Sequence, residues 1–379
     1  MGHPTCGTRF RWNNRPPFSL VLINVIFIGG FVCIFYLFYL DNLTVPQILA
    51  LPIFQVISRF KENATEDTIV LPDITWMALT ENGLSEFDKL YGPRVIFFIE
   101  TSGTSRLNPR VVCAVESAAK TNPKAMVLLL LTHPVRMLKL ESNRALIKVL
   151  ANYTNVKVVT MDSTQILLES NYRSLVELDK HTNSNSANVH TSDFLRNLMV
   201  LIFGGIYFDT DYVIVNDLSP LFEQQNFIPY TQSGDLIGNF AFGFRRQHPL
   251  LQLVVKKAAK HYDPKVYISG LIAYVNGVCE FYNLTHIWQA RDAKKLGDVL
   301  VLNSTVLTPL DYPYFEIFYH EGKAYLAEQW VKSSLAVHFW NQMNLMRSNL
   351  KLEQNSTAPY AALARQFCPV AFSNCGKLF

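Results

Sequence analysis

Two aspartates separated by one residue form the pair whose spacing most directly suggests chemistry. Asp209, Thr210 and Asp211 stand between the apolar stretches IYF and YVIV. On an extended segment, side chains at positions i and i+2 point to the same face, so both carboxylates would lie together. Two like charges at that distance resist burial unless a cation accompanies them. The pair therefore predicts a site for Mn²⁺ or Mg²⁺, which accept oxygen ligands and can neutralise a diphosphate.

A second charged pair precedes the aspartates on a predicted helix. We expect this helix to begin at Thr191 or Ser192, which can cap it, and to end at Gly204. Asp193 and Arg196 would then share one face of its first turn. Arg196 can contact a phosphate, and Asp193 can accept hydrogen bonds from a sugar hydroxyl. The alternative is a surface ion pair that contributes little to stability.

Alternating strands and helices are predicted to position these residues. Buried strands are expected over 94–100, 125–132 and 156–162, because each is a short apolar run. A helix follows the first strand, with Asn108 as its capping residue and a proline at its first position. This order predicts a parallel sheet with helices on both faces. Ligands of such sheets bind at the carboxyl ends of the strands, where Thr101 follows the first one.

The N-terminal region has the features of a membrane anchor. Residues 18–40 form an uncharged apolar run, long enough for a bilayer core of about 30 Å. Arginines precede the run and an aspartate follows it, which places the N-terminus in the cytosol. The alternative, a cleaved signal peptide, would have a shorter apolar region followed by small residues. We predict a cytoplasmic tail at 1–17, a transmembrane anchor at 18–40, a luminal stem at 41–90 and a catalytic domain at 91–379.

Glycosylation sequons and cysteines agree with a luminal location for the remainder of the chain. All the N-x-S/T sequons follow the apolar run, and they start at Asn42, Asn63, Asn152, Asn283, Asn303 and Asn355. The cysteines beyond the run could form structural disulfides in three pairings, and they are Cys113, Cys279, Cys368 and Cys375. The net charge of +4 comes with no basic tract, so nucleic acid is not an expected partner.

From about residue 94 to its end, the sequence resembles the alpha-1,4-glycosyltransferases in four ordered blocks. The blocks are IFFIETSGTSRLNPRVVCAVESAAKTNP (96–123), SDFLRNLMVLIFGGIYFDTDYVIV (192–215), AVHFWN (336–341) and RQFCP (365–369). The second block is specific, because Ser-Asp, Arg, Gly-Gly-Ile-Tyr and Asp-Thr-Asp fall at the spacing of the family. The resemblance implies an α/β fold of the GT-A type with a mostly parallel central sheet. It also implies a UDP-sugar donor, retention of anomeric configuration, and a glycolipid or glycoprotein acceptor.

The resemblance further implies roles for individual residues. Asp209 and Asp211 would engage the metal ion and the diphosphate, and His338 would be a third metal ligand. The alternative for His338, a histidine beside a tryptophan, is a packed core residue. Asp193 and Arg196 would hold the donor sugar. The remaining residues expected around the nucleotide are Phe98, Glu100, Thr101, Tyr207 and Trp340.

Two stretches depart from the family pattern. The family has a Gly-Pro pair with a nearby histidine where this chain has Gly270 followed by Leu271, with Tyr267 in place of a polar residue. The family also places an asparagine before an Ala-Phe stretch, whereas here Asn239 is separated from it by Phe240. Since both stretches, 238–240 and 267–275, are expected to line the donor sugar or the acceptor, reduced activity is one consequence to test.

Together these features predict a Golgi type II membrane hexosyltransferase that uses a UDP-sugar and Mn²⁺ or Mg²⁺ and could form a homo-oligomer. One alternative is a catalytically weak or inactive luminal homologue that binds sugar nucleotides or serves as a partner subunit. Another is a phosphatase of the haloacid-dehalogenase type, because YFDTDYVIV fits its Asp-x-Asp-x-Val signature. That class needs a later acidic loop, and the Gly-Asp pairs of this chain lack its second aspartate.

Overall fold

The structure, a computed structural model, describes residues 68–379 apart from 133, 170–186, 232–236, 262–265 and 267–268. The predicted tail and anchor lie outside the described residues, as does most of the predicted stem. Among the described helices, none combines the length and apolar character needed to cross a membrane. Residues from Val70 to Phe379 belong to one compact unit.

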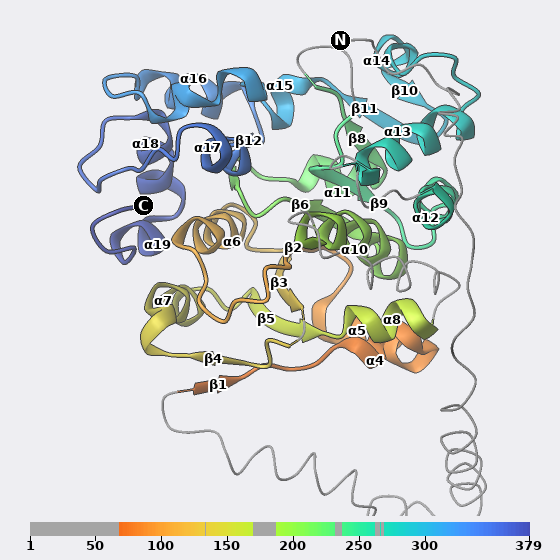
Figure 1. Cartoon of the computed structure of the whole chain (residues 1–379), viewed down its shortest axis with the longest axis horizontal. Helices are drawn as coiled ribbons and strands as arrows, with labels where there is room; N and C mark the ends of the chain where they lie inside the picture. The colour runs from red at the N-terminus through yellow and green to blue at the C-terminus, as the bar shows by residue number, and fades with distance from the viewer. Residues whose placement is uncertain (1–67, 133, 170–186, 232–236, 262–265, 267–268) are drawn as a thin grey trace, which may run out of the picture. The chain divides into compact units, whose positions relative to one another are not determined.

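A mixed sheet of eight strands, in the order β10-β11-β8-β9-β6-β2-β3-β5, lies at the centre of this unit (Figure 1). Its strands are β2 (Val95–Glu100), β3 (Met126–Thr132), β5 (Val156–Met161), β6 (Gly205–Phe208), β8 (Phe227–Pro229), β9 (Ala241–Phe244), β10 (Lys295–Leu296) and β11 (Val299–Leu302). Neighbours among β6, β2, β3 and β5 are parallel, as are β11 and β8. Strand β9 is antiparallel to both of its neighbours. The predicted α/β class is confirmed, with a sheet that is mixed and mostly parallel.

The first predicted elements are found where the sequence placed them. The apolar run at 94–100 forms β2, and both faces of this strand are buried. Helix α6 (Pro109–Thr121) starts with the expected cap, since the Asn108 side chain accepts a hydrogen bond of 2.9 Å from the Arg110 N–H. Short apolar runs become strands here because helices cover both faces of the sheet.

Helices form a layer on each side of the sheet. Figure 1 shows α6 and α10 (Ala187–Phe203) on opposite sides of β2. Helix α10 packs on β2 and β6, and beyond it lie α12 (Pro249–His261) and α13 (Ser269–Phe281). Helix α6 packs on β3 and is followed outward by α18 (Pro359–Phe367) and α19 (Pro369–Ser373).

A second, smaller sheet joins β7 (Tyr212–Ile214) to β12 (Ala336–His338) in antiparallel pairing. The remaining elements are β1 (Thr68–Val70), α4 (Thr75–Leu79), α5 (Glu81–Tyr91), β4 (Met137–Lys139), η1 (Glu141–Asn143), α7 (Arg144–Asn152), α8 (Ser163–Glu169), α11 (Ser219–Gln224), α14 (Trp288–Ala293), α15 (Ser304–Leu307), η2 (Tyr312–Tyr319), α16 (Tyr325–Ser333) and α17 (Asn341–Arg347).

The predicted start of the helix that carries Asp193 is wrong. Helix α10 begins at Ala187, so Thr191 and Ser192 lie inside it and do not cap it. It ends as expected, with Gly204 at a left-handed φ of +70°. A capping residue marks only a local option, and the preceding Ala-Asn-Val-His residues continue the helix instead.

Part of the segment assigned to the stem contributes to the core. Helix α4 and all but the last residue of α5 fall within 41–90, and Ile74, Met77 and Phe87 are buried. The Phe87 ring stacks on that of Phe203 in α10, with centroids 4.0 Å apart. The folded unit therefore includes residues before 91, because the apolar face of α5 is buried by contacts such as those of Phe87 with Phe97 and Phe203.

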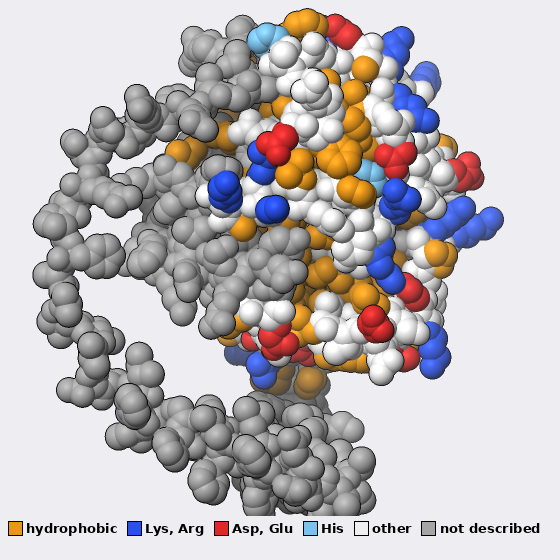
Figure 2. Space-filling model, turned by 90° about the vertical axis from the view of Figure 1, so that its right-hand side faces the viewer, with side chains coloured by type: hydrophobic (Ala, Val, Ile, Leu, Met, Phe, Trp, Pro, Cys, Tyr) orange, Lys and Arg blue, Asp and Glu red, His pale blue; other side chains and the backbone are white. Residues whose placement is uncertain are grey.

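A disulfide ties α6 to the C-terminal helices. Cys113 bonds Cys368, which lies between α18 and α19 and is 255 residues away in sequence. Cys375 is a free thiol, so the four cysteines that follow residue 40 do not form two bridges among themselves. On the face shown in Figure 2, Lys and Arg side chains are interspersed with acidic and hydrophobic ones.

Candidate active site

The two aspartates of the Asp-Thr-Asp motif lie in a turn between strands of different sheets. Strand β6 ends at Phe208 and β7 begins at Tyr212. The prediction that the carboxylates share one face of a single extended segment is therefore wrong. A hydrogen bond of 2.9 Å from the Asp209 N–H to the Phe240 carbonyl fixes the start of this turn. Phe240 immediately precedes β9.

His338 reaches the aspartates through the second sheet. Strand β12 pairs with β7 so that His338 stands opposite Tyr212, and the two rings stack with centroids 4.5 Å apart. The His338 Nε2 atom lies 2.9 Å from Asp211 Oδ1 and 4.0 Å from Asp209 Oδ2. The side chain is only 3% exposed. Antiparallel pairing thus brings together residues that are far apart in the sequence.

The three side chains form a group with the chemistry of a metal site. One potential ligand atom from each of Asp209, Asp211 and His338 lies within 4.8 Å of the others. Carboxylate oxygens suit ions such as Mg²⁺ and Mn²⁺, and imidazole nitrogens suit divalent transition-metal ions. The His338 Nδ1 atom is buried and has no hydrogen-bond partner in the described part of the chain. The other ring nitrogen, Nε2, is the one that faces the carboxylates.

Arg196 links this group to Asp193. Its Nη1 atom lies 3.0 Å from Asp209 Oδ1, and its Nη2 atom lies 3.4 Å from Asp193 Oδ1. The guanidinium also lies over the Tyr207 ring, 4.9 Å from its centroid. The side chains of Arg196 and Asp193 are each only 8% exposed. The alternative of a surface ion pair is therefore wrong, and the pair lies in the second and third turns of α10 rather than the first.

Asn239 joins both members of this buried pair. Its Nδ2 atom donates to Asp193 Oδ1 at 2.8 Å, and its backbone oxygen accepts from Arg196 Nη1 at 2.9 Å. The inserted Phe240 does not remove Asn239 from the site. Gly270 of α13 closes the other side, because a Cβ at this position would lie 2.4 Å from the Cβ of Asp193. Tyr267 lies outside the described residues.

The surroundings shift the pKa values of the two motif carboxylates, Asp209 and Asp211, in opposite directions. Burial, together with the charge of Asp211, raises the pKa of Asp209, although Arg196 opposes the shift. Burial alone would also raise the pKa of Asp211. The charge and hydrogen bond of His338 and the backbone N–H of Asn341 outweigh it, so the pKa of Asp211 lies below its ordinary value. Asp211 is therefore the more firmly ionised carboxylate of the pair.

Arg196 remains a cation in these surroundings. Burial tends to lower its pKa, but the negative charge of Asp209 and the other acidic groups nearby raises it above the ordinary value. Burial also raises the pKa of Asp193, against the effects of Arg196 and Asn239. The site therefore holds one permanent positive charge among three carboxyl groups.

Tyr207 and Trp340, which the sequence analysis expects around the nucleotide, both adjoin the cluster. The Tyr207 hydroxyl donates to Asp209 Oδ1 at 2.6 Å. The Trp340 ring lies 4.0 Å from the His338 ring between centroids, and its Nε1 atom donates to the Leu310 carbonyl at 2.9 Å. Both aromatic residues contact a potential metal ligand directly.

The three candidates on or after β2 have different surroundings. Strand β2 pairs in parallel with β6, so its end at Glu100 lies at the same sheet edge as the aspartates. Glu100 Oε1 accepts a hydrogen bond of 2.8 Å from the Ser102 N–H, and Thr101 is partly exposed. Phe98 is fully buried and packs against Phe208, so its side chain belongs to the core rather than to an accessible surface.

Two known sequence patterns cover this site. Residues 108–228 match the model of a glycosyltransferase sugar-binding region containing the DXD motif. Residues 243–375 match the alpha-1,4-glycosyltransferase conserved region. These two matches identify the chain as a glycosyltransferase that carries an alpha-1,4-glycosyltransferase region. The first region of this glycosyltransferase supplies Asp193, Arg196 and the two motif aspartates, and the second supplies His338. The DXD region implies a nucleotide-sugar donor and a divalent metal ion.

The names of similar proteins agree with these two matches. The chain is 23% identical over 283 residues to lactosylceramide 4-alpha-galactosyltransferase of Rattus norvegicus, covering 75% of this chain and 76% of the relative. It is 26% identical over 293 residues to human alpha-1,4-N-acetylglucosaminyltransferase, covering 75% and 81%. A solved complex of the galactosyltransferase LgtC with donor and acceptor sugar analogs aligns over 74% of this chain and 95% of its own, with 15% identity and a TM-score of 0.39.

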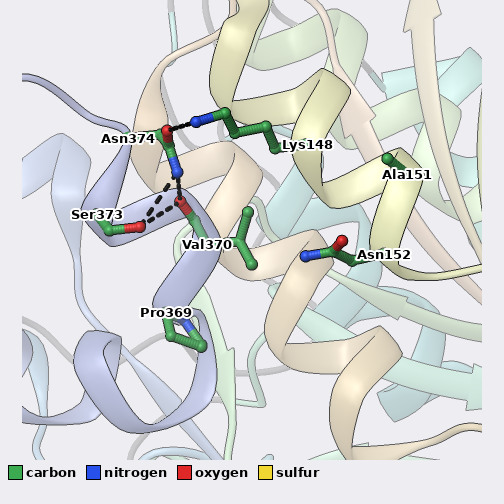
Figure 3. A pocket seen from close by; sticks show the side chains of 7 residues that line it. All are labelled: Lys148, Ala151, Asn152, Pro369, Val370, Ser373 and Asn374. Atoms are coloured by element: carbon green, nitrogen blue, oxygen red, sulfur yellow. Dashed lines mark hydrogen bonds between the residues drawn. The ribbon is translucent and has the colours of Figure 1, made fainter.

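A separate hollow of about 390 Å³ lies between α7 and α19, and none of the candidate residues lines it (Figure 3). Lys148 donates to Asn374 Oδ1 at 2.5 Å at its edge, and Asn374 Nδ2 in turn donates to the Val370 carbonyl at 2.7 Å. Asn152, which starts one of the sequons, is exposed at this hollow.

Asn341 is a site residue that sequence reasoning did not single out. Its backbone N–H donates to Asp211 Oδ2 at 2.8 Å. The AVHFWN block includes it, but a contact made by a backbone N–H leaves no signal in the residue type. Only the paired strands β7 and β12 place it beside the aspartate.

Proposed function

We propose that this glycosyltransferase transfers galactose or an N-acetylhexosamine from a UDP-sugar, in alpha-1,4 linkage and with retention, to a glycolipid or glycoprotein glycan. We further propose a GT-A type fold, Mn²⁺ dependence and a Golgi location, with a single N-terminal anchor at 18–40 and the catalytic domain in the lumen. The names of the relatives support the two sugar classes and the lactosylceramide-type acceptor.

One observation carries this proposal: Asp209, Asp211 and His338 present three ligand atoms in one small group, and Arg196 contacts the same group. A divalent ion bound there would act as a Lewis acid that stabilises negative charge on the departing diphosphate. Binding it would replace the hydrogen bond between His338 and Asp211. A permanent guanidinium charge beside two metal-binding carboxylates suits an anionic ligand such as a diphosphate.

Arg196 has the geometry to orient this chemistry. Its guanidinium is fixed by Ser192, by the Asn239 carbonyl and by Asp209, at distances from 2.9 to 3.0 Å. Such prior fixation lets a cation stabilise charge that develops in a transition state without first reorganising. The Asp193 carboxylate, held by Asn239, is placed to accept hydrogen bonds from hydroxyls of the donor sugar.

In a single step, retention requires the acceptor to attack from the face that the diphosphate leaves. In the proposed step the bond from the sugar C1 to the diphosphate oxygen breaks, and a bond from C1 to the acceptor oxygen forms on the same face. The acceptor hydroxyl proton passes to the departing phosphate oxygen. A two-step route through a carboxylate nucleophile is the rival mechanism.

The test is UDP release by the full-length chain, made in a secretory host and solubilised in detergent. UDP-galactose, UDP-N-acetylgalactosamine and UDP-N-acetylglucosamine are each supplied with Mn²⁺, with and without lactosylceramide. The Asp211→Ala variant is the matched control. We expect one donor to give acceptor-dependent release that the variant loses, and the NMR spectrum of the product to give the linkage position and the anomeric configuration.

Two outcomes would contradict the proposal. UDP binding without turnover of any donor would favour the alternative of an inactive homologue or partner subunit. Transfer that survives in Asp211→Ala, with Mn²⁺ present, would exclude the metal role assigned to the motif. Removal of metal ions with a chelator should abolish activity. Whether Mn²⁺ or Mg²⁺ restores the activity then identifies the ion.

A further inference from the structure

The Asp211 carboxylate is held on both of its oxygens. Oδ1 lies 2.9 Å from His338 Nε2, whereas Oδ2 accepts a hydrogen bond of 2.8 Å from the backbone N–H of Asn341. Asn341 is the first residue of α17, and the residue before it, Trp340, has a left-handed backbone with φ +55° and ψ +42°. This turn of the backbone directs the Asn341 N–H at the carboxylate.

The Asn341 side chain is held in turn by two buried residues. Its Oδ1 atom accepts hydrogen bonds from Arg110 Nη1 at 3.2 Å and from the Tyr319 hydroxyl at 3.1 Å. Arg110 Nη1 also donates to the Tyr319 hydroxyl at 3.0 Å, so the three side chains form a closed network. Both Arg110 and Tyr319 are only 8% exposed.

Arg110 is itself fixed from several directions. Its Nη2 atom donates to the backbone oxygens of Leu350 at 3.3 Å and Phe379 at 3.0 Å. Its guanidinium lies 5.3 Å from the centroid of the Tyr319 ring and 5.5 Å from that of Tyr360. Arg110 is in α6 and is separated from Asn341 by 231 residues. The network thus connects the N-terminal half of the fold to the segment that contacts Asp211.

We propose that Arg110 and Tyr319 are positioning residues that, through Asn341, hold Asp211 with Oδ1 directed toward the metal ion. This inference rests on the metal site of the proposed function. A carboxylate with one oxygen already bonded to a fixed N–H has fewer orientations to lose when its other oxygen binds a cation. Groups that orient metal ligands typically change metal affinity by about 10- to 100-fold when they are removed.

The experiment measures Mn²⁺ binding in the presence of UDP, using the electron paramagnetic resonance signal of free Mn²⁺ and the full-length chain in detergent. Asn341→Ala keeps the backbone N–H but removes the side chain that anchors it. We expect the dissociation constant for Mn²⁺ to rise about tenfold or more. The matched control is Asn216→Ala, which removes two hydrogen bonds of 2.7 Å to the carbonyls of Val331 and Ser334 without touching Asp211.

A double variant separates positioning from loss of packing. Tyr319→Phe removes one hydroxyl and should raise the dissociation constant about fivefold, the usual effect of one hydrogen bond. Added to Asn341→Ala, it should cause no further loss, because both changes break the same connection. Independent, additive effects would instead indicate that Tyr319 acts by packing.

The possible failures are distinguishable. If the unaltered protein binds Mn²⁺ with UDP but Asn341→Ala binds it equally well, the positioning role is wrong and the metal site stands. If Asn216→Ala weakens binding as much as Asn341→Ala, the effect is general destabilisation and the inference is also wrong. If the unaltered protein binds no Mn²⁺, the metal assignment itself fails, and the positioning role with it.

Discussion

At the scale of single residues, Arg196 determines how three acidic groups coexist in a buried site. It contacts Asp209 and Asp193 with different nitrogens and lies over the Tyr207 ring. Removing one member of a buried charge network leaves the others uncompensated, which commonly costs about 3–5 kcal/mol. A lysine would keep the charge but lose the planar fork that serves several acceptors at once.

Gly270 is expected to set the position of Asp193. In Gly270→Ala the new Cβ would lie 2.4 Å from the Asp193 Cβ and 2.5 Å from its Oδ2, so the carboxylate must move. We expect kcat/KM for the donor to fall about tenfold or more, which corresponds to about 1.4 kcal/mol of transition-state stabilisation. Steady-state kinetics with varied donor concentration measures it.

The matched control for this prediction is Gly277→Ala in the same helix. There a Cβ would lie 2.6 Å from Val254 Cγ2, in the core and away from Asp193. We expect it to lower the melting temperature while the Michaelis constant for the donor stays unchanged. Equal kinetic effects of the two substitutions would mean that α13 as a whole, rather than Gly270, controls the site.

At the scale of elements, α6 is joined to the C-terminal helices by the Cys113–Cys368 disulfide. Replacing both cysteines by alanine should lower the free energy of unfolding by about 2–5 kcal/mol, because the unfolded chain regains the freedom that the bridge removed. Denaturant unfolding followed by circular dichroism measures the change. An unchanged midpoint, relative to the unaltered protein treated identically, would show that the bridge contributes nothing.

Glu116 forms a second connection between the same helices. Its carboxylate is fully buried and accepts hydrogen bonds from the backbone N–H groups of Val370 at 3.0 Å and Ala371 at 2.7 Å, at the start of α19. Burial raises the pKa of Glu116 above its ordinary value of 4.5, against the effects of these N–H groups and of the Tyr153 hydroxyl. The folded state therefore retains this proton to higher pH than the unfolded state does.

The sign of the pH effect follows from that direction. The stability contributed by protonated Glu116 is complete below the ordinary pKa of 4.5 and is lost as the pH rises through the higher folded pKa. Relative to Glu116→Gln, the free energy of unfolding of the unaltered protein should therefore decrease as the pH is raised from 4 through the folded pKa. Denaturant titrations of both proteins at several pH values test this. A difference that grows with pH in favour of Glu116 would reverse the assignment.

At the scale of the whole molecule, the proposed topology predicts glycans on the catalytic domain. The sequon asparagines at 152, 283, 303 and 355 are all exposed, so folding leaves room for a glycan at each of them. In a secretory host we expect peptide-N-glycosidase to reduce the apparent mass, with one glycan fewer in Asn152→Gln. In intact Golgi vesicles, the C-terminal portion should resist added protease until detergent is supplied. An unglycosylated, protease-accessible chain would contradict the luminal orientation.

Most of the secondary structure near the site could be predicted from the sequence, because it depends on the properties of neighbouring residues. The apolar runs at 95–100, 126–132 and 156–161 became strands, and Asn108 and Pro109 began a helix as their capping preferences predict. The start of α10 was predicted wrongly. Thr191 and Ser192 are residue types that favour a helix N-cap, but both lie inside the longer helix. The contribution of residues before 91 to the core was not predicted for a similar reason, because the burial of Phe87 depends on its distant partner Phe203.

The sequence by itself determined the residue types of the site: the Asp-Thr-Asp motif, Arg196, Asp193 and a candidate histidine. Only the tertiary structure decided how these meet, because the pairing of β7 with β12 is a contact between segments more than 120 residues apart, as in the 127 residues between Asp211 and His338. It also decided the contributions of Asn239 and Asn341, which act partly through backbone groups that every residue possesses. The chemistry of a side chain is known from the sequence, whereas a backbone N–H acquires a specific partner only when the chain folds.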